Sequence, residues 1–207
     1  IVDRLVGSEM CIRDSFLVGA SIAADSEVTL PHVGINPTRT GVIDILKLMG
    51  ADIRLENQRD AGGEPVADLV VKAAPLKGLE IPEALVPLAI DEFPAIFIAA
   101  ACAEGETILR GAEELRVKES DRIQVMADGL AALGVSHEVF EDGIRITGGE
   151  FGGGEIQSHG DHRIAMSFAM AALRATGPIT IHDCANVATS FPGFAQLATH
   201  AGLKLEV

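Results

Sequence analysis

A threefold internal repeat is the feature of this sequence that most constrains its fold. Residues 15–56, 92–140 and 162–207 share one order of predicted elements: an apolar helix, a short turn, a strand, a polar loop, an amphipathic helix, a glycine and another strand. The repeats recur at about 70 residues, which is too long for a thin solenoid unit and suits a small α/β module. The sequence therefore predicts an α/β fold of three similar units around a pseudo-threefold axis.

Two kinds of helix alternate within the repeat. Residues 95–103 and 164–173 are apolar on every side, which predicts that these helices are buried together in a shared centre. Residues 41–50 and 122–134 place their apolar side chains in one stripe, which predicts helices outside that centre. The sheets of the three units are also expected to lie outside the buried helices.

Glycines and β-branched residues mark where the other elements begin and end. Gly50, Gly134 and Gly202 follow the amphipathic helices, where a left-handed residue commonly ends a helix. The glycine-rich stretches at 61–65 and 148–155 predict turns or hairpin loops within the domain. Short runs rich in Val, Ile, Thr and Leu predict strands at 27–30, 67–73, 106–109, 143–149 and 178–181.

The composition argues against several classes of protein. The chain has 207 residues, 48% of them hydrophobic but only 4% aromatic, so Ala, Leu, Ile and Val must fill a substantial core. A formal net charge of −14 argues against a nucleic-acid partner, because phosphate backbones are held by clustered Lys and Arg. No run of about 18 apolar residues predicts a membrane span. The scattered cysteines Cys11, Cys102 and Cys184 favour a reducing, cytoplasmic location.

The first 14 residues follow none of this periodicity. Charges interrupt every apolar run in residues 1–14, so they do not form a signal peptide, and we interpret them as a non-native or irregular leader. The domain proper is predicted to span residues 15–207, in units of about 15–74, 75–149 and 150–207.

Charged residues cluster where three of the predicted helices begin. Asp91 precedes the helix at 95–103, residues 118–122 (KESDR) lead into an amphipathic helix, and residues 161–163 (DHR) open the helix at 164–173. The N-terminus of a helix exposes unpaired N–H groups and a partial positive charge. Several such ends facing one cleft, reinforced by Lys and Arg, predict a site for a small anionic ligand.

Most of these residues also have an ordinary structural explanation. Asp91 and Asp161 are equally well explained as N-caps, since Asp is among the favoured residues there. Glu119 suits a first-turn acid that complements the helix dipole. Lys118 and Arg122 are four residues apart and would suit a solvated helix face.

Arg163 is harder to explain as a structural residue. A cation at the positive end of an otherwise apolar helix opposes the macrodipole, so it needs an anionic partner, either Asp161 or a ligand. His162 is as consistent with a structural histidine as with a ligand contact. The other histidines show no metal-ligand spacing, so the sequence predicts no metal site.

Six motifs carry a family resemblance. They are NPTRTG at 36–41, GGEPVADL at 62–69, IDEFP at 90–94, RVKESDRI at 116–123, DHRIAMSF at 161–168 and TSFPGF at 189–194. The last four, in series, resemble the 5-enolpyruvylshikimate 3-phosphate (EPSP) synthase family, and the first two resemble its glyphosate-tolerant bacterial subgroup. Each motif is weak alone, but the series is specific and the resemblance runs from about Ser15 to Val207.

The resemblance implies one half of a two-domain enzyme. Each domain of the family contains three βαβαββ units, the two form an inverse α/β barrel around a cleft, and this chain resembles the C-terminal-side domain. The family reaction transfers the enolpyruvyl group of phosphoenolpyruvate to the 5-hydroxyl of shikimate 3-phosphate and releases phosphate, a step of the shikimate pathway towards chorismate and aromatic amino acids. No metal or organic cofactor takes part. The missing N-terminal-side domain is then a required partner, and this chain alone is expected to be inactive.

The resemblance also implies catalytic roles. Asp91 matches the carboxylate that contacts the shikimate hydroxyls and acts as a base. Glu119 matches the proposed proton donor to the methylene carbon of phosphoenolpyruvate, and Lys118 matches a residue between both substrates. Two carboxylates in different environments suit a reaction in which a hydroxyl loses a proton while a carbon gains one. The sequence leaves the division of proton transfers among these three residues open.

The remaining matches concern binding. Arg122 and Arg163 match arginines that clamp phosphoenolpyruvate, and guanidinium groups suit a highly anionic ligand. His162 matches a histidine beside the phosphate. Thr189 stands where many family members have Lys, so we do not count it as a substrate contact, and this departure favours the glyphosate-tolerant subgroup.

Two other functions are compatible with the sequence. The enolpyruvyl transferase that acts on UDP-N-acetylglucosamine shares the fold and the donor, although the KESDR and DHRIAM motifs favour the shikimate enzyme. A non-catalytic anion-binding domain would keep Arg163 but would not need both Asp91 and Glu119.

Overall fold

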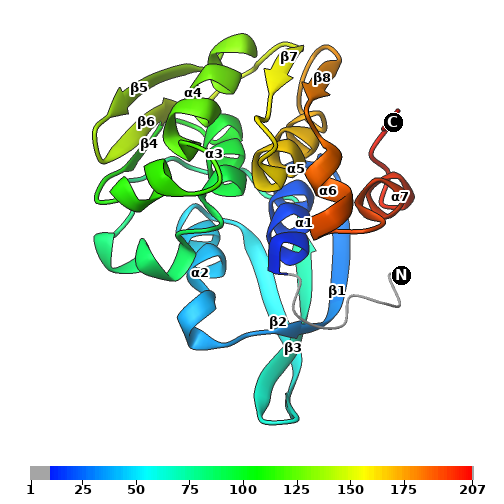
Figure 1. The fold of residues 1–207 in the computed structure, drawn as a ribbon. Helices are drawn as coiled ribbons and strands as arrows, with labels where there is room; N and C mark the ends of the chain where they lie inside the picture. Colours follow the sequence, from blue (N-terminus) through cyan, green and yellow to red (C-terminus); the bar gives the residue numbers. More distant parts are fainter. Residues whose placement is uncertain (1–9, 207) are drawn as a thin grey trace.

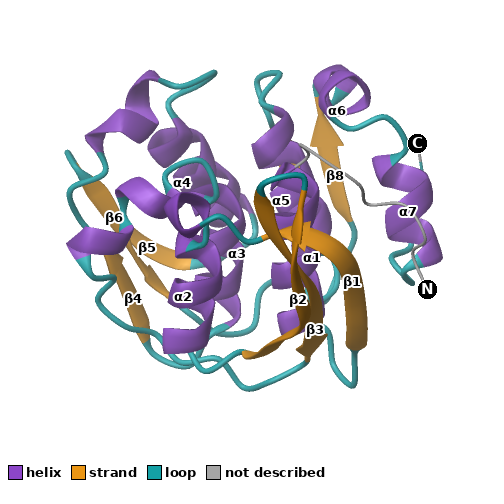
Figure 2. Ribbon diagram, turned by 90° about the horizontal axis from the view of Figure 1, so that it is seen from below, coloured by secondary structure: helices purple, strands orange, loops and turns teal. Residues whose placement is uncertain are grey.

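Three helices form the centre of the molecule, and sheets lie around them (Figure 1). Figure 2, seen from below, shows the strands on the outside with these helices between them. The central helices are α1 (Met10–Ile22), α3 (Phe93–Cys102) and α5 (His162–Ala171). Residues 93–101 of α3 are all buried, and α5 buries every residue except Arg163. The predicted apolar centre is confirmed.

The described part of the chain begins inside the expected leader. The computed structural model describes residues 10–206, and the first helix starts at Met10. Residues 10–14 are therefore helical, whereas residues 1–9 lie outside the described residues. The non-native origin of residues 1–14 stays a prediction.

The first two units each contain a three-stranded antiparallel sheet with the last strand in the middle. The first sheet has the order β1-β3-β2 and consists of β1 (Glu27–Gly34), β2 (Asp52–Ala61) and β3 (Glu64–Lys72). The second has the order β4-β6-β5 and consists of β4 (Glu106–Leu109), β5 (Ser136–Phe140) and β6 (Gly143–Thr147). The stretch at 61–65 forms the β2–β3 hairpin turn, as predicted.

The third unit differs from the prediction at its end. Its described strands, β7 (Gly154–Gln157) and β8 (Ile179–His182), pair in parallel. The sequence predicted a further strand after Gly202, but residues 203–206 form none. In the first two units the corresponding strands, β2 and β5, pair with a hairpin partner that follows them in the chain.

The glycine-rich stretch at 148–155 connects β6 to β7 but is not a hairpin loop, so the hairpin alternative was wrong. It leads into β7, which pairs with β8 and not with the preceding strand β6. Its glycines instead permit close backbone packing. A Cβ on Gly148 would lie 1.9 Å from the carbonyl oxygen of Ala103, and one on Gly153 would lie 2.1 Å from that of Pro178. Composition alone does not separate this use of glycine from a turn.

The outer helices end identically in the three units, which supports the repeat. They are α2 (Gly41–Leu48), α4 (Arg122–Ala132) and α7 (Phe194–His200). The glycine after each has a positive φ, of 97° at Gly50, 81° at Gly134 and 103° at Gly202. The next residue donates its N–H to a helix carbonyl five residues back, always at 2.9 Å: Ala51 to Leu46, Val135 to Leu130 and Leu203 to Ala198. These Schellman-type ends confirm the predicted left-handed caps.

Short helices join the main elements. They are α6 (Ala185–Ser190) and the 3-10 helices η1 (Pro37–Arg39), η2 (Glu83–Leu85), η3 (Pro87–Ala89) and η4 (Glu113–Val117). None of the described helices has the length and apolarity needed to cross a membrane.

Candidate active site

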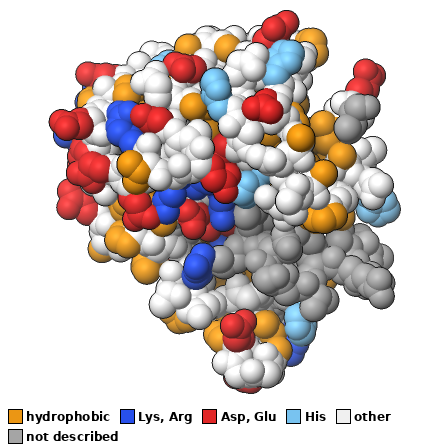
Figure 3. Space-filling model, viewed as in Figure 1, with side chains coloured by type: hydrophobic (Ala, Val, Ile, Leu, Met, Phe, Trp, Pro, Cys, Tyr) orange, Lys and Arg blue, Asp and Glu red, His pale blue; other side chains and the backbone are white. Residues whose placement is uncertain are grey.

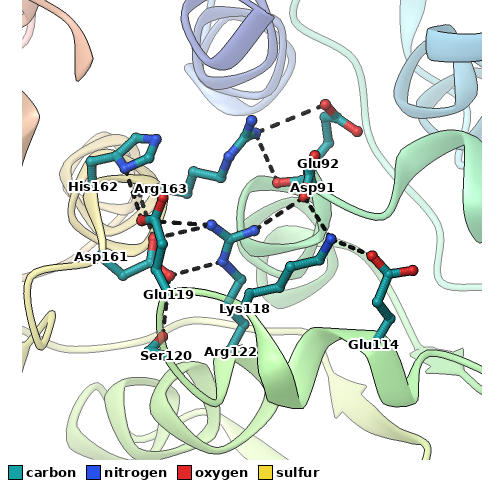
Figure 4. A network of polar contacts seen from close by, with 10 residues as sticks. All are labelled: Asp91, Glu92, Glu114, Lys118, Glu119, Ser120, Arg122, Asp161, His162 and Arg163. Atoms are coloured by element: carbon teal, nitrogen blue, oxygen red, sulfur yellow. Dashed lines mark hydrogen bonds and ion pairs between the residues drawn. The ribbon is translucent and has the colours of Figure 1, made fainter.

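Three helix starts meet on one face of the molecule (Figure 4). Asp91 lies in the turn before α3, Lys118 and Glu119 lie in the segment before α4, and Asp161 lies at the N-cap of α5. The space-filling view shows Lys and Arg side chains gathered among acidic ones in a patch on this face, beside a histidine (Figure 3). One wall thus carries the residues on which the anion-site hypothesis depends: Asp91, Lys118, Glu119, Arg122 and Arg163.

Arg122 is the centre of this wall. Its side chain is only 3% exposed and is surrounded by three carboxylates: Nε lies 2.8 Å from Asp161, Nη1 lies 3.4 Å from Asp91 and Nη2 lies 3.8 Å from Glu119. The alternative of a solvated face is therefore excluded for Arg122. A buried guanidinium needs such partners, and in return it fixes the three carboxylates relative to one another.

Lys118 and Asp91 form an ionised pair. The Lys118 Nζ lies 3.3 Å from Asp91 Oδ1 and also contacts the Glu114 carboxylate. The hydrogen bond to Glu114, assisted by Asp91, outweighs burial and raises the Lys118 pKa above its ordinary value. Burial raises the Asp91 pKa, but the charges of Arg163, Lys118 and Arg122 outweigh it and leave the Asp91 pKa below its ordinary value.

Glu92 is a site residue that the sequence analysis missed. Its side chain is 3% exposed, and its Oε1 lies 3.8 Å from Arg163 Nη1, which also donates a 2.9 Å hydrogen bond to the Asp91 backbone oxygen. Burial, reinforced by the Asp14 carboxylate, raises the Glu92 pKa to about 7. The predicted protein partner of the Arg163 guanidinium, Asp161, instead binds the Arg163 backbone N–H. The sequence did contain one signal for Glu92, which is an acid directly before an apolar helix.

The two aspartates proposed as N-caps differ. Asp161 accepts a 3.0 Å hydrogen bond from the Arg163 backbone N–H, and also one from the Ser120 hydroxyl at 3.1 Å, so the N-cap explanation is confirmed for it. Asp91 is not the N-cap of α3, because that position belongs to Glu92, which makes no side-chain cap bond. The N-cap explanation was therefore wrong for Asp91.

His162 is held by Glu119. Its Nδ1 lies 3.0 Å from Glu119 Oε2, and potential metal ligands of these two residues and Asp161 lie within 4.8 Å of one another. A cation bound there would lie beside the Arg122 guanidinium. The Asp161 oxygens, moreover, already accept hydrogen bonds from Arg122 and Ser120. We therefore assign no metal to this group.

The TSFPGF motif contributes mainly to packing. Phe191 and Phe194 are buried, with ring centroids 5.8 Å apart, and Phe194 also packs against Phe16 at 6.2 Å. Thr189, at the departure from the family pattern, is exposed on α6.

The model of the EPSP synthase (3-phosphoshikimate 1-carboxyvinyltransferase) family matches residues 13–197. The chain belongs to the EPSP synthase family. Relatives named 3-phosphoshikimate 1-carboxyvinyltransferase from Alkalilimnicola ehrlichii and Nitrosococcus oceani are 71% and 68% identical, and each match covers 92% of this chain. A solved EPSP synthase structure from Acinetobacter baumannii has 61% identity and a TM-score of 0.94, over 97% of this chain and 47% of that one.

The family assignment confirms the predicted α/β fold of an enolpyruvyl transferase. The enolpyruvyl transferase NikO from Streptomyces tendae, at 21% identity, matches 94% of this chain and 43% of its own with a TM-score of 0.72, which shows the shared fold alone. This chain spans 43% of the length of the two EPSP synthase relatives. Membership of the glyphosate-tolerant subgroup stays a prediction.

Proposed function

We propose that this chain supplies one wall of the active site of 3-phosphoshikimate 1-carboxyvinyltransferase. The reaction would transfer the enolpyruvyl group of phosphoenolpyruvate to the 5-hydroxyl of shikimate 3-phosphate and release phosphate. The observation that carries the proposal is the joining of Asp91, Glu119 and Asp161 through the buried Arg122 guanidinium, in a member of this family. We place the reaction in the cytoplasm, which the scattered cysteines favour.

The cations of the wall suit anionic substrates. Lys118 lies between Asp91 and the exposed Glu114, and this position supports its assignment as a residue that contacts both substrates. Arg163 and Arg122 are assigned to phosphoenolpyruvate, with His162 beside them. Because three acids enclose Arg122, its contribution to binding would include holding those acids in place.

The carboxylates suit the proton transfers. Asp91, with its lowered pKa, is ionised in this structure and is a weak base there. Anions bound to Lys118 and Arg163 would offset those cations and raise the Asp91 pKa towards the range useful for a general base. Glu119, half exposed and next to His162, is assigned as the proton donor to the methylene carbon.

The alternatives have less support. The relatives with 60–71% identity carry the shikimate enzyme's name, which argues against UDP-N-acetylglucosamine as the acceptor. A purely anion-binding domain would have no need of Asp91 and Glu119 on the same wall as the cations. Because the chain spans under half of its relatives, we expect the remaining half to supply further substrate contacts.

Replacing Asp91 tests the proposal. In a full-length protein where residues 15–207 replace the matching part of the Alkalilimnicola ehrlichii relative, Asp91→Ala should lower kcat by roughly 10²–10⁴-fold in a phosphate-release assay, because it removes a positioned acid–base group. Asp128→Ala, at an exposed position of α4, should keep normal turnover. Near-normal activity of the Asp91 variant would reject the assigned role, and consumption of UDP-N-acetylglucosamine by the unmutated protein would favour the rival function.

A further inference from the structure

Glu92 occupies an unusual position for a carboxyl group. It is buried at the start of α3, and its Oε1 has no hydrogen-bond partner. The side chain lines a small pocket that Asp91 and Arg163 also line. Figure 4 shows Glu92 and the Asp91 backbone on the same side of the Arg163 guanidinium. A buried carboxyl oxygen without a hydrogen bond is costly. Two groups face the Glu92 side chain: the Arg163 guanidinium and the Asp14 carboxyl, whose own pKa is also raised by burial.

The Arg163 guanidinium is held from that side by two different groups. Its Nη1 donates a 2.9 Å hydrogen bond to the Asp91 carbonyl oxygen, whereas Glu92 Oε1 lies 3.8 Å from the same atom. The Asp91 carbonyl group thus fixes the position of the Arg163 guanidinium. The Glu92 carboxyl group, at a slightly longer distance, can balance its positive charge. An anionic ligand on Arg163 would compete with Glu92 for one positive charge.

We propose that Glu92 is a proton-linked counter-ion of Arg163, which takes up a proton from solvent when a phosphate or carboxylate group binds that arginine. The inference rests on the proposed function, because it assumes that Arg163 receives an anion. It adds a positioning residue and a pH linkage to the site. By reciprocity, the same linkage makes protonation of Glu92 tighten anion binding.

The charges around Glu92 give the direction of the effect. From α1 it faces Asp14 and Arg13, from α5 it faces Arg163, and Asp91 precedes it in the chain. Burial and the two aspartates raise its pKa, to about 7, and the two arginines lower it. An anion on Arg163 would cancel part of the lowering effect, so the Glu92 pKa would rise further on binding.

Carbon-13 NMR of the Glu92 carboxyl in this chain tests the linkage, with inorganic sulfate as the probe because its charge is constant between about pH 5 and pH 9. Sulfate should raise the Glu92 titration midpoint by at least about half a pH unit, which corresponds to roughly threefold tighter binding to the protonated form. Arg163→Met should raise the midpoint without sulfate, whereas Lys118→Met should change it far less.

The variants separate this inference from the proposed function. Glu92→Gln keeps the side-chain shape and should remove most of the pH dependence of sulfate affinity, while Glu114→Gln should retain that dependence. If sulfate moves the Arg163 guanidinium signal but not the Glu92 midpoint, the linkage is wrong and the anion site stands. If sulfate shifts neither the Arg163 guanidinium signal nor the Glu92 titration midpoint, both the linkage and the anion site of this chain are overturned.

Discussion

At the scale of single residues, two N-cap aspartates of the site should differ greatly in what they contribute to stability. Asp161 is fully buried, caps α5 and holds the buried Arg122 at 2.8 Å. Asp121 caps α4 and pairs with Arg116, but both of those side chains are partly exposed. Asp161 therefore balances the charge of a buried guanidinium, whereas Asp121 is an ordinary cap with a partly exposed ion pair.

Asp161→Ala should therefore lower the free energy of unfolding by about 3–5 kcal/mol, because it deprives a buried guanidinium of its nearest carboxylate. Asp121→Ala should lower it by roughly 1 kcal/mol, the usual cost of losing a cap. Urea-induced unfolding of both variants measures the difference. Equal losses would mean that Asp91 and Glu119 suffice to hold Arg122 and that Asp161 is mainly a cap.

At the scale of elements, the sequence predicted the helices and helix ends that recur in the units. It did not predict features that depend on packing between residues distant in the chain. The apolar helices α3 and α5 and the glycine caps of α2, α4 and α7 follow from local periodicity, and they are confirmed. The role of Gly148 and Gly153 depends on carbonyl groups of Ala103 and Pro178, which no local pattern reveals. The strand that the repeat predicted at 203–206 is also not formed, so the repeat pattern did not carry through to these residues.

The NPTRTG motif supplies a second such contact, between α2 and the segment that leads to Asp91. A Cβ on Gly41 would lie 2.6 Å from the Leu88 carbonyl carbon and 2.9 Å from the Ala89 nitrogen. Because backbone atoms cannot rotate away, Gly41→Ala should displace η3 and cost roughly 1–3 kcal/mol of stability. Gly34→Ala is the matched control, since open space surrounds that position. Thermal unfolding that ranks the two variants equally would contradict this account.

At the scale of the whole molecule, the motifs predicted which residues share a wall but not its balance of charge. The three helix starts bring Asp91, Lys118, Glu119, Arg122 and Arg163 together as expected. The motifs did not single out Glu92 or Glu114, because the importance of these two residues comes from contacts with Arg163 and Lys118. Counting these two and Asp161, the carboxyl groups of the wall outnumber its cations by five to three.

This balance predicts that the chain cannot turn over substrate alone. Two strongly anionic substrates would meet more carboxyl groups than cations on this wall, so further positive charge must come from the part of the relatives that this chain does not span. Mixing the chain with the separately produced remaining part of the Alkalilimnicola ehrlichii relative should give phosphate release that neither part gives alone. The same mixture made with Asp91→Ala should be nearly inactive. Normal turnover by the isolated chain, or a stable but inactive complex of the two parts, would contradict the idea that the two halves complete one site.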